Sequence, residues 1–109
     1  MDQAYLKELV TYVQAGDVNA LEPLLMWAYT PVSFLCQKML KDSHIAQTQT
    51  REILQAIGHK LPSLQSPGMF EKWVIRLTAA RCVQIQNKNT WMDDEEVREE
   101  ELPIIGESL

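Results

Sequence analysis

The chain has 109 residues and a formal net charge of −5 at pH 7, and apolar residues make up 46% of it. This length and apolar content suit one domain with a single modest core. No apolar run approaches the roughly 20 residues that cross a bilayer, and the N-terminus lacks the basic start and apolar stretch of a secretion signal. We therefore expect a cytoplasmic protein that does not contact membranes.

Cys36 and Cys82 are the only cysteines, and each lies within an apolar stretch. A structural disulfide is not expected in a reducing compartment, so two small buried side chains are the simplest interpretation. His44 and His59 lie on a segment separate from both cysteines, and no spacing indicates a zinc site or a catalytic thiol with its base. We expect no metal and no cofactor.

The acidity is confined to the C-terminal end of the chain. Residues 1–88 hold nine Lys and Arg against seven Asp and Glu, a balance of +2, whereas residues 89–109 hold one Arg against eight acids, a balance of −7. The sequence therefore predicts a nearly neutral domain over 1–88 and an acidic tail or linker over 89–109. Disorder is the first interpretation of this tail, and a helix that docks back on the domain is the alternative.

The sequence of the first half of the domain predicts helices. Gly and Pro are few, and apolar residues recur at helical steps, so we expect an all-α fold, a compact bundle of four to five helices. A helix over about 3–15 ends at Gly16, and Asp17 can cap a second helix over about 18–29. Pro31 then either kinks the chain or starts a third helix over 32–40. Because that segment is apolar on most sides, Phe34 included, we expect it to be central.

The second half predicts two longer helices joined by a loop. Asp42 caps a helix over about 44–60, which has one apolar face. Its other face carries Gln47, Gln49, Arg51, Glu52 and Gln55. The loop 61–68 leads into a helix over about 67–87, which Ser66 and Pro67 begin. Ile75, Cys82 and Ile85 lie off the apolar stripe of that last helix, which indicates burial on two sides.

Three sequence blocks follow one another along the chain: Gly16-Asp17, then Tyr29-Thr30-Pro31, then Phe70-Glu71-Lys72-Trp73-Val74-Ile75-Arg76-Leu77. Their order and separations resemble region 2, the promoter-melting domain, of bacterial RNA polymerase sigma factors of the extracytoplasmic-function type. The resemblance covers about residues 5–88. The acidic tail resembles the linker that joins this domain to the family's second DNA-binding domain.

This resemblance implies a domain that binds core RNA polymerase and holds the non-template promoter strand as single-stranded DNA. The residues that it assigns to the strand are Ser63, Gln65, Ser66, Lys72, Arg76, Arg81 and Lys88. The three loop residues among them, together with Leu64, shape a pocket for a flipped base. The residues that it assigns to the polymerase are Gln47, Gln49, Arg51, Glu52 and Gln55. An anti-sigma protein is a further candidate partner.

The chain departs from the family where these contacts are made. The docking helix has Ala46-Gln47-Thr48-Gln49 where the family is rich in acids, and the last helix has Thr78-Ala79-Ala80 in place of a group that includes Arg. Lys72, Arg76 and Arg81 also fit the wet face of an amphipathic helix, and Trp73 fits a core position better than a stacking platform. The alternative function is therefore a sigma-like protein-interaction module that no longer binds DNA.

An enzyme is not expected. The sequence has no Gly-rich phosphate loop, no His-Glu-x-x-His and no paired carboxylates outside the tail. The function that the sequence predicts is binding without bond-making.

Overall fold

The computed structural model describes residues 3–93, and every regular element in this range is helical. The four α-helices are α1 (Gln3–Gln14), α2 (Leu21–Met39), α3 (Ser43–Lys60) and α4 (Phe70–Asp93). Short 3₁₀ turns precede α2 (Val18–Ala20), follow α3 (Leu61–Ser63) and precede α4 (Pro67–Met69). The all-α prediction is confirmed, whereas the predicted helices over 18–29 and 32–40 are largely one helix. The tail beyond residue 93 lies outside the described residues.

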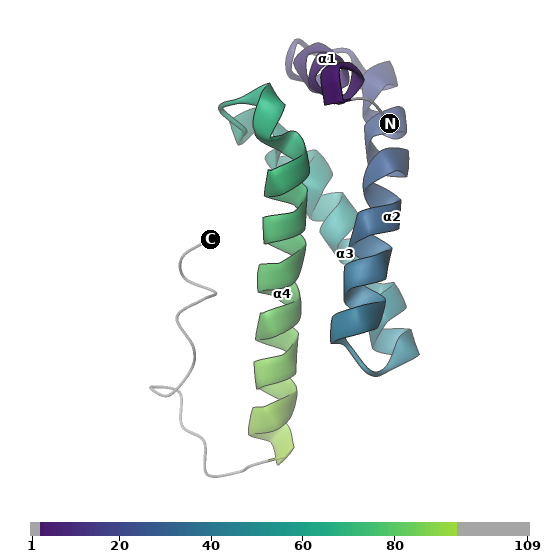
Figure 1. Ribbon diagram of the computed structural model, residues 1–109, viewed down its shortest axis with the longest axis vertical. Helices are drawn as coiled ribbons and strands as arrows, with labels where there is room; N and C mark the ends of the chain where they lie inside the picture. The colour runs from purple at the N-terminus through teal and green to yellow at the C-terminus, as the bar shows by residue number, and fades with distance from the viewer. Residues whose placement is uncertain (1–2, 94–109) are drawn as a thin grey trace.

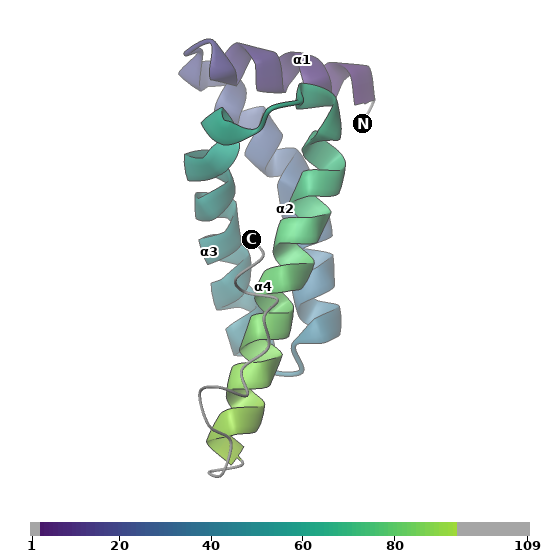
Figure 2. The same ribbon diagram turned by 90° about the vertical axis from the view of Figure 1, so that its left-hand side faces the viewer.

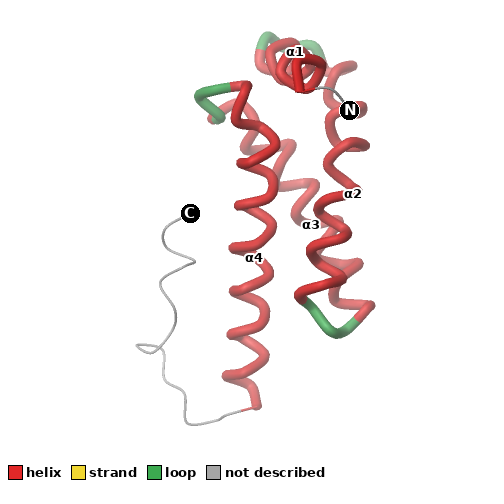
Figure 3. Tube along the Cα trace, viewed as in Figure 1, coloured by secondary structure: helices red, strands yellow, loops and turns green. Residues whose placement is uncertain are grey.

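Helices α2, α3 and α4 form a bundle, and α1 lies across one end of it (Figures 1 and 2). Helix α2 runs away from α1, α3 returns towards it, and α4 runs away again. The connection between α3 and α4 therefore lies beside α1, and the connection between α2 and α3 lies at the opposite end of the bundle (Figure 3).

Helix α2 continues through Pro31. A proline inside a helix removes one backbone hydrogen bond and costs on the order of 3 kcal/mol. Buried side chains nevertheless follow one another at four-residue steps on both sides of it: Leu24, Ala28, Val32 and Cys36. Burial of this continuous face outweighs the local cost, as tertiary packing commonly does. The prediction of a separate helix over 32–40 is therefore wrong.

Phe34 and Ile75 depart from their predicted burial. The Phe34 side chain is 61% exposed, with the Lys38 ammonium 5.5 Å from the ring centroid. Phe34 is a two-residue step from both Val32 and Cys36, which turns it about 200° around the helix, away from the buried face. Ile75 is 41% exposed for the same kind of reason, because it points away from the face of α4 that packs on the bundle. Residue type alone predicted both positions wrongly, whereas Cys82 is buried and Ile85 packs against the core as predicted.

The starts of the helices follow from local chemistry. Asp42 accepts hydrogen bonds from the backbone N–H groups of His44 (2.8 Å) and Ile45 (3.1 Å), and so caps α3 as predicted. Asp17 accepts from Asn19 N at 3.0 Å and caps a 3₁₀ turn, so that α2 begins only at Leu21. Gly16 has a φ of 103°, which lets the chain leave α1 through a conformation that other residues rarely adopt.

The core joins all four helices. Its largest fully buried apolar side chains are Val10, Leu24, Val32, Ile53, Ile57, Leu61, Phe70 and Val74. The Phe70 ring lies between two tryptophans, with centroids 5.8 Å from Trp27 and 6.1 Å from Trp73. Trp73 is half-buried against this core, which agrees with its predicted packing role. Phe70 thereby connects the start of α4 to α2.

Candidate functional site

The connection after α3 and the first turns of α4 border a hollow of about 410 Å³. We call it the loop hollow. The residues that line it are Lys60, Ser63, Trp73, Arg76 and Leu77. Two of these side chains are cations and one is a large aromatic ring. Cations bind phosphate and an aromatic face stacks on a base, so this combination suits an anion that carries a flat ring.

Helix α1 holds the loop in place. The Gln14 side-chain amide donates to the backbone carbonyls of Leu61 (3.1 Å) and Leu64 (2.7 Å). Within the loop, Ser63 Oγ donates to the Lys60 carbonyl at 2.7 Å. The Leu61 carbonyl also accepts the backbone N–H of Leu64 at 3.0 Å, and together these bonds fix the rim of the hollow.

The other two predicted loop residues, Gln65 and Ser66, are exposed. Ser66 precedes the 3₁₀ turn that leads into α4, but its side chain makes no capping hydrogen bond there. Neither residue lines the loop hollow, so of the three predicted loop residues only Ser63 does.

Lys72 and Arg76 are both exposed and lie one turn apart on the same face of α4. Glu71 does not interrupt them, since it lies about 100° around the helix from Lys72. Its carboxylate accepts a 2.7 Å hydrogen bond from the Gln3 amide of α1 instead. Together with Lys60, the two side chains give this end of the bundle three positive charges on and next to the loop hollow.

Arg81 faces a different direction. The five-residue step from Arg76 turns about 140° around α4. Arg81 Nη1 lies 3.3 Å from Gln49 Oε1 and 3.6 Å from Glu52 Oε1, so the guanidinium bridges α4 and α3. Arg81 therefore lies outside the surface that Lys72 and Arg76 share. Lys88 belongs to α4, but the structure does not describe its side chain.

The residues that the resemblance assigns to the polymerase divide into two sets. Gln47, Arg51 and Gln55 are exposed on the outer face of α3. Gln49 is only 8% exposed, because a two-residue step from Gln47 turns it about 200° towards α4. The prediction that Gln49 shares the outer face is therefore wrong. Glu52 is exposed but lies at the α4 edge, where it pairs with Arg81.

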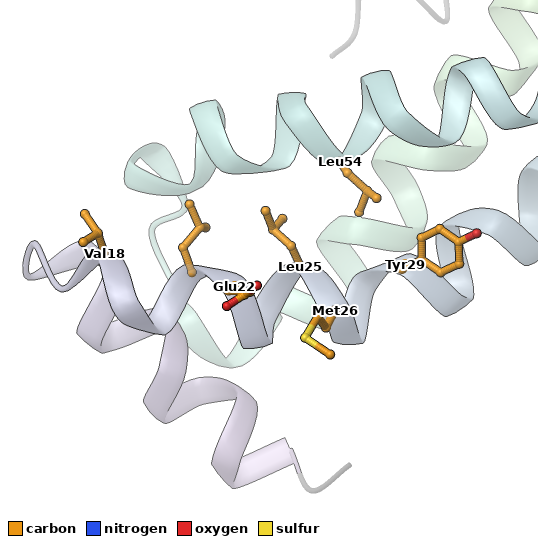
Figure 4. A pocket seen from close by; sticks show the side chains of 7 residues that line it. Val18, Glu22, Leu25, Met26, Tyr29 and Leu54 are labelled. Atoms are coloured by element: carbon orange, nitrogen blue, oxygen red, sulfur yellow. The ribbon is translucent and has the colours of Figure 1, made fainter.

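A second hollow, which the sequence reasoning missed, lies on α2 and α3. It has a volume of about 590 Å³, and the residues that line this α2–α3 groove are Val18, Leu21, Glu22, Leu25, Met26, Tyr29 and Leu54. Figure 4 shows Leu25 pointing from α2 towards α3 and Leu54 pointing back from α3. Val18, Met26 and Tyr29 are 79%, 69% and 54% exposed.

A signal for this groove was present in the sequence. Leu21, Leu25 and Tyr29 follow one another at four-residue steps, beside the buried stripe that begins at Leu24. The apolar arc of α2 is thus wider than one core contact needs. Exposed apolar surface of this kind marks interaction sites in folded proteins.

Inside the bundle, Cys36 and Cys82 meet. Their Sγ atoms lie 3.8 Å apart and both residues are fully buried. The hydrogen bond from Cys82 lowers the pKa of Cys36, burial opposes this by raising it, and the Thr50 hydroxyl lowers it further. The same hydrogen bond, together with burial, raises the pKa of the Cys82 thiol. The prediction of two buried small side chains is confirmed, but their contact was not foreseen.

Within residues 3–93, no group of three His, Cys, Asp or Glu side chains could hold a metal ion. None of the helices in this range has both the length and the hydropathy that a bilayer crossing requires. No family model, curated protein or solved structure matches the chain.

Proposed function

We propose that this domain acts in transcription initiation, where it docks on core RNA polymerase and holds an unpaired promoter strand at the loop hollow. The observation that carries the proposal is the grouping of Lys60, Trp73 and Arg76 around one hollow. This is also the place where the resemblance to sigma factors expects the strand, between the loop and the last helix.

The chemistry of the loop hollow fits a single strand. Stacking of a base on an aromatic ring contributes roughly 1–3 kcal/mol, and phosphate contacts add affinity that falls with salt. Trp73 is half-buried against the core, so it offers a base part of its ring. With three cations at this surface, we expect a modest affinity that depends on the polymerase for its full strength.

The α2–α3 groove supports the polymerase half of the proposal. Arg51 and Gln47, both exposed, lie one and two turns before Leu54 on the same face of α3. The apolar groove therefore has a polar border that includes residues already assigned to the polymerase. An apolar centre with a polar rim is typical of protein interfaces.

A second candidate function is docking on the polymerase without DNA binding. The pairing of Arg81 with Gln49 and Glu52 favours it, because a cation that the resemblance assigns to the strand is engaged within the domain. The α2–α3 groove would then be the only functional surface among the described residues.

A salt titration of a fluorescent single-stranded oligonucleotide separates the two candidates. We expect Lys72→Gln/Arg76→Gln to weaken binding and to lower the slope of log affinity against log salt by about 1.4, since each lost phosphate contact removes about 0.7. The matched control is Lys38→Gln/Lys41→Gln, which changes the net charge equally at the opposite end of the bundle.

Equal weakening by both double variants would mean that net charge alone acts, and would contradict a strand site at the loop hollow. A slope near zero for the unmodified chain, with polymerase still retained in a pull-down, would establish the protein-docking function instead.

A further inference from the structure

The contact between Cys36 and Cys82 leads to an inference that is independent of both surfaces. We propose that this dithiol is a redox modification site, which closes to an intramolecular disulfide in reaction with a hydroperoxide and so ties α2 to α4.

The geometry brings the two sulfurs within reach of a bond. The Sγ atoms are 3.8 Å apart, and a disulfide needs about 2.05 Å, a difference that side-chain rotation and a small helix shift can cover. The helices that carry them are held together on both sides of the pair. Gln86 Nε2 donates to the Met39 carbonyl at 2.7 Å on one side, and the Trp27 and Phe70 rings pack on the other.

The surroundings give the two thiols different roles. Cys36 receives the hydrogen bond from Cys82, which lowers its pKa although burial opposes this. The Thr50 hydroxyl of α3, which donates to the Ala46 carbonyl at 2.8 Å, lowers the pKa of Cys36 further. At Cys82 the hydrogen bond to Cys36 and burial raise the pKa of the thiol, and they outweigh the Arg81 guanidinium, which lowers it while Gln49 and Glu52 hold it from α3. A lowered thiol pKa favours attack on an oxidant, which makes Cys36 the first nucleophile and Cys82 the resolving thiol.

The reaction balances with one hydroperoxide. The Cys36 thiolate attacks an oxygen of hydrogen peroxide, an S–O bond forms, the O–O bond breaks, and the released hydroxide takes up a proton to become water. Cys82 sulfur then attacks the sulfenic sulfur of Cys36, an S–S bond forms, and the S–O bond breaks to release a second water. The two sulfurs lose two electrons and two protons in all, and the peroxide gains them.

Access to the dithiol requires a local opening, since neither thiol is exposed to solvent. Proteins open locally at a lower free energy than they unfold, and a hydroperoxide is small enough to enter through such an opening. A second protein molecule is too large to enter through such an opening. We therefore expect a disulfide within the chain and no linked dimers.

The test uses the full chain, reduced and then treated with hydrogen peroxide. We expect a mass loss of about two units, both thiols lost to alkylation in denaturant, and one peptide pair joining Cys36 to Cys82, all reversed by dithiothreitol. Thermal unfolding of the oxidised chain should move to higher temperature. Two thiols that remain free in excess peroxide, or linked dimers as the main product, would overturn the proposal.

Three variants sharpen the result. In Cys82→Ala the Cys36 sulfenic acid has no resolving thiol, so dimedone should trap it, whereas Cys36→Ala should react several-fold more slowly. Thr50→Val keeps the side-chain shape and removes the hydroxyl, so disulfide formation should slow several-fold while the circular dichroism stays the same. Trapping at Cys82 in preference to Cys36, or an unchanged rate in Thr50→Val, would contradict the assigned roles.

Discussion

The loop hollow and the α2–α3 groove are built from different parts and carry different chemistry. The loop hollow depends on a connection that α1 holds in place, and two cations, Lys60 and Arg76, line it. The groove lies mainly on two regular helices and is apolar, and among the described residues that line it only Glu22 is charged. A nucleic acid suits the first surface and a protein suits the second. If these surfaces bind separate partners, a substitution at one surface should abolish its binding and leave binding at the other unchanged.

The largest effect is expected from a substitution in the core, which disrupts both surfaces together. Phe70 is 1% exposed, begins α4 and contacts Trp27 and Trp73, so it supports the start of the loop hollow and the α2 side at once. We expect Phe70→Ala to lower the free energy of unfolding by about 3–5 kcal/mol. Urea denaturation followed by circular dichroism measures this. A loss below about 1 kcal/mol would mean that the ring is not the shared support.

The next effect should be confined to the groove. Met26→Asp places a charge on the apolar lining at a side chain that is 69% exposed, so the fold should persist. We expect polymerase retention in a pull-down titration to weaken at least tenfold, about 1.4 kcal/mol, with oligonucleotide affinity changed only by the added charge.

Phe34→Asp is the matched control for this variant. Phe34 is an apolar residue of the same helix, 61% exposed, that does not line the groove. Equal losses of polymerase retention in the two variants would remove the special role of the groove and with it the contrast between the surfaces.

The smallest effect is expected at the end of the bundle far from α1, where a substitution should change stability alone. Asp42→Ala removes the cap that accepts from His44 N and Ile45 N, and should cost about 1 kcal/mol of stability without altering either surface. Asp42→Asn retains a capping oxygen and should cost little. A change in oligonucleotide binding by Asp42→Ala would show that stability alone governs the loop hollow.

Much of the fold could be predicted from periodicity. Leu6, Leu9 and Val10 of α1, and Ile53 and Ile57 of α3, are buried as their helical spacing indicates. Of the two alternatives predicted at Pro31, the start of a separate helix was wrong, because local propensity does not register the burial that continues on both sides of it.

The candidate site was predictable only in part, because its contacts join residues far apart in the chain. Ser63 and Arg76, which the resemblance assigns to the strand, line one hollow. The pairing of Arg81 with Gln49 spans 32 residues and that of Cys82 with Cys36 spans 46. Such pairs depend on how helices pack, which the spacing along one helix does not determine.

The two hydrogen bonds from Gln14 bear on how strongly any ligand can be held. Ordering a free backbone costs roughly 1–2 kcal/mol for each residue, and a pliable connection incurs that cost when it closes on its target. Here the Gln14 side chain of α1 already holds the carbonyls of Leu61 and Leu64 before any ligand binds. Such preorganisation leaves more of the contact energy to appear as affinity, so the affinity of any ligand at the loop hollow would depend on a helix that need not touch it.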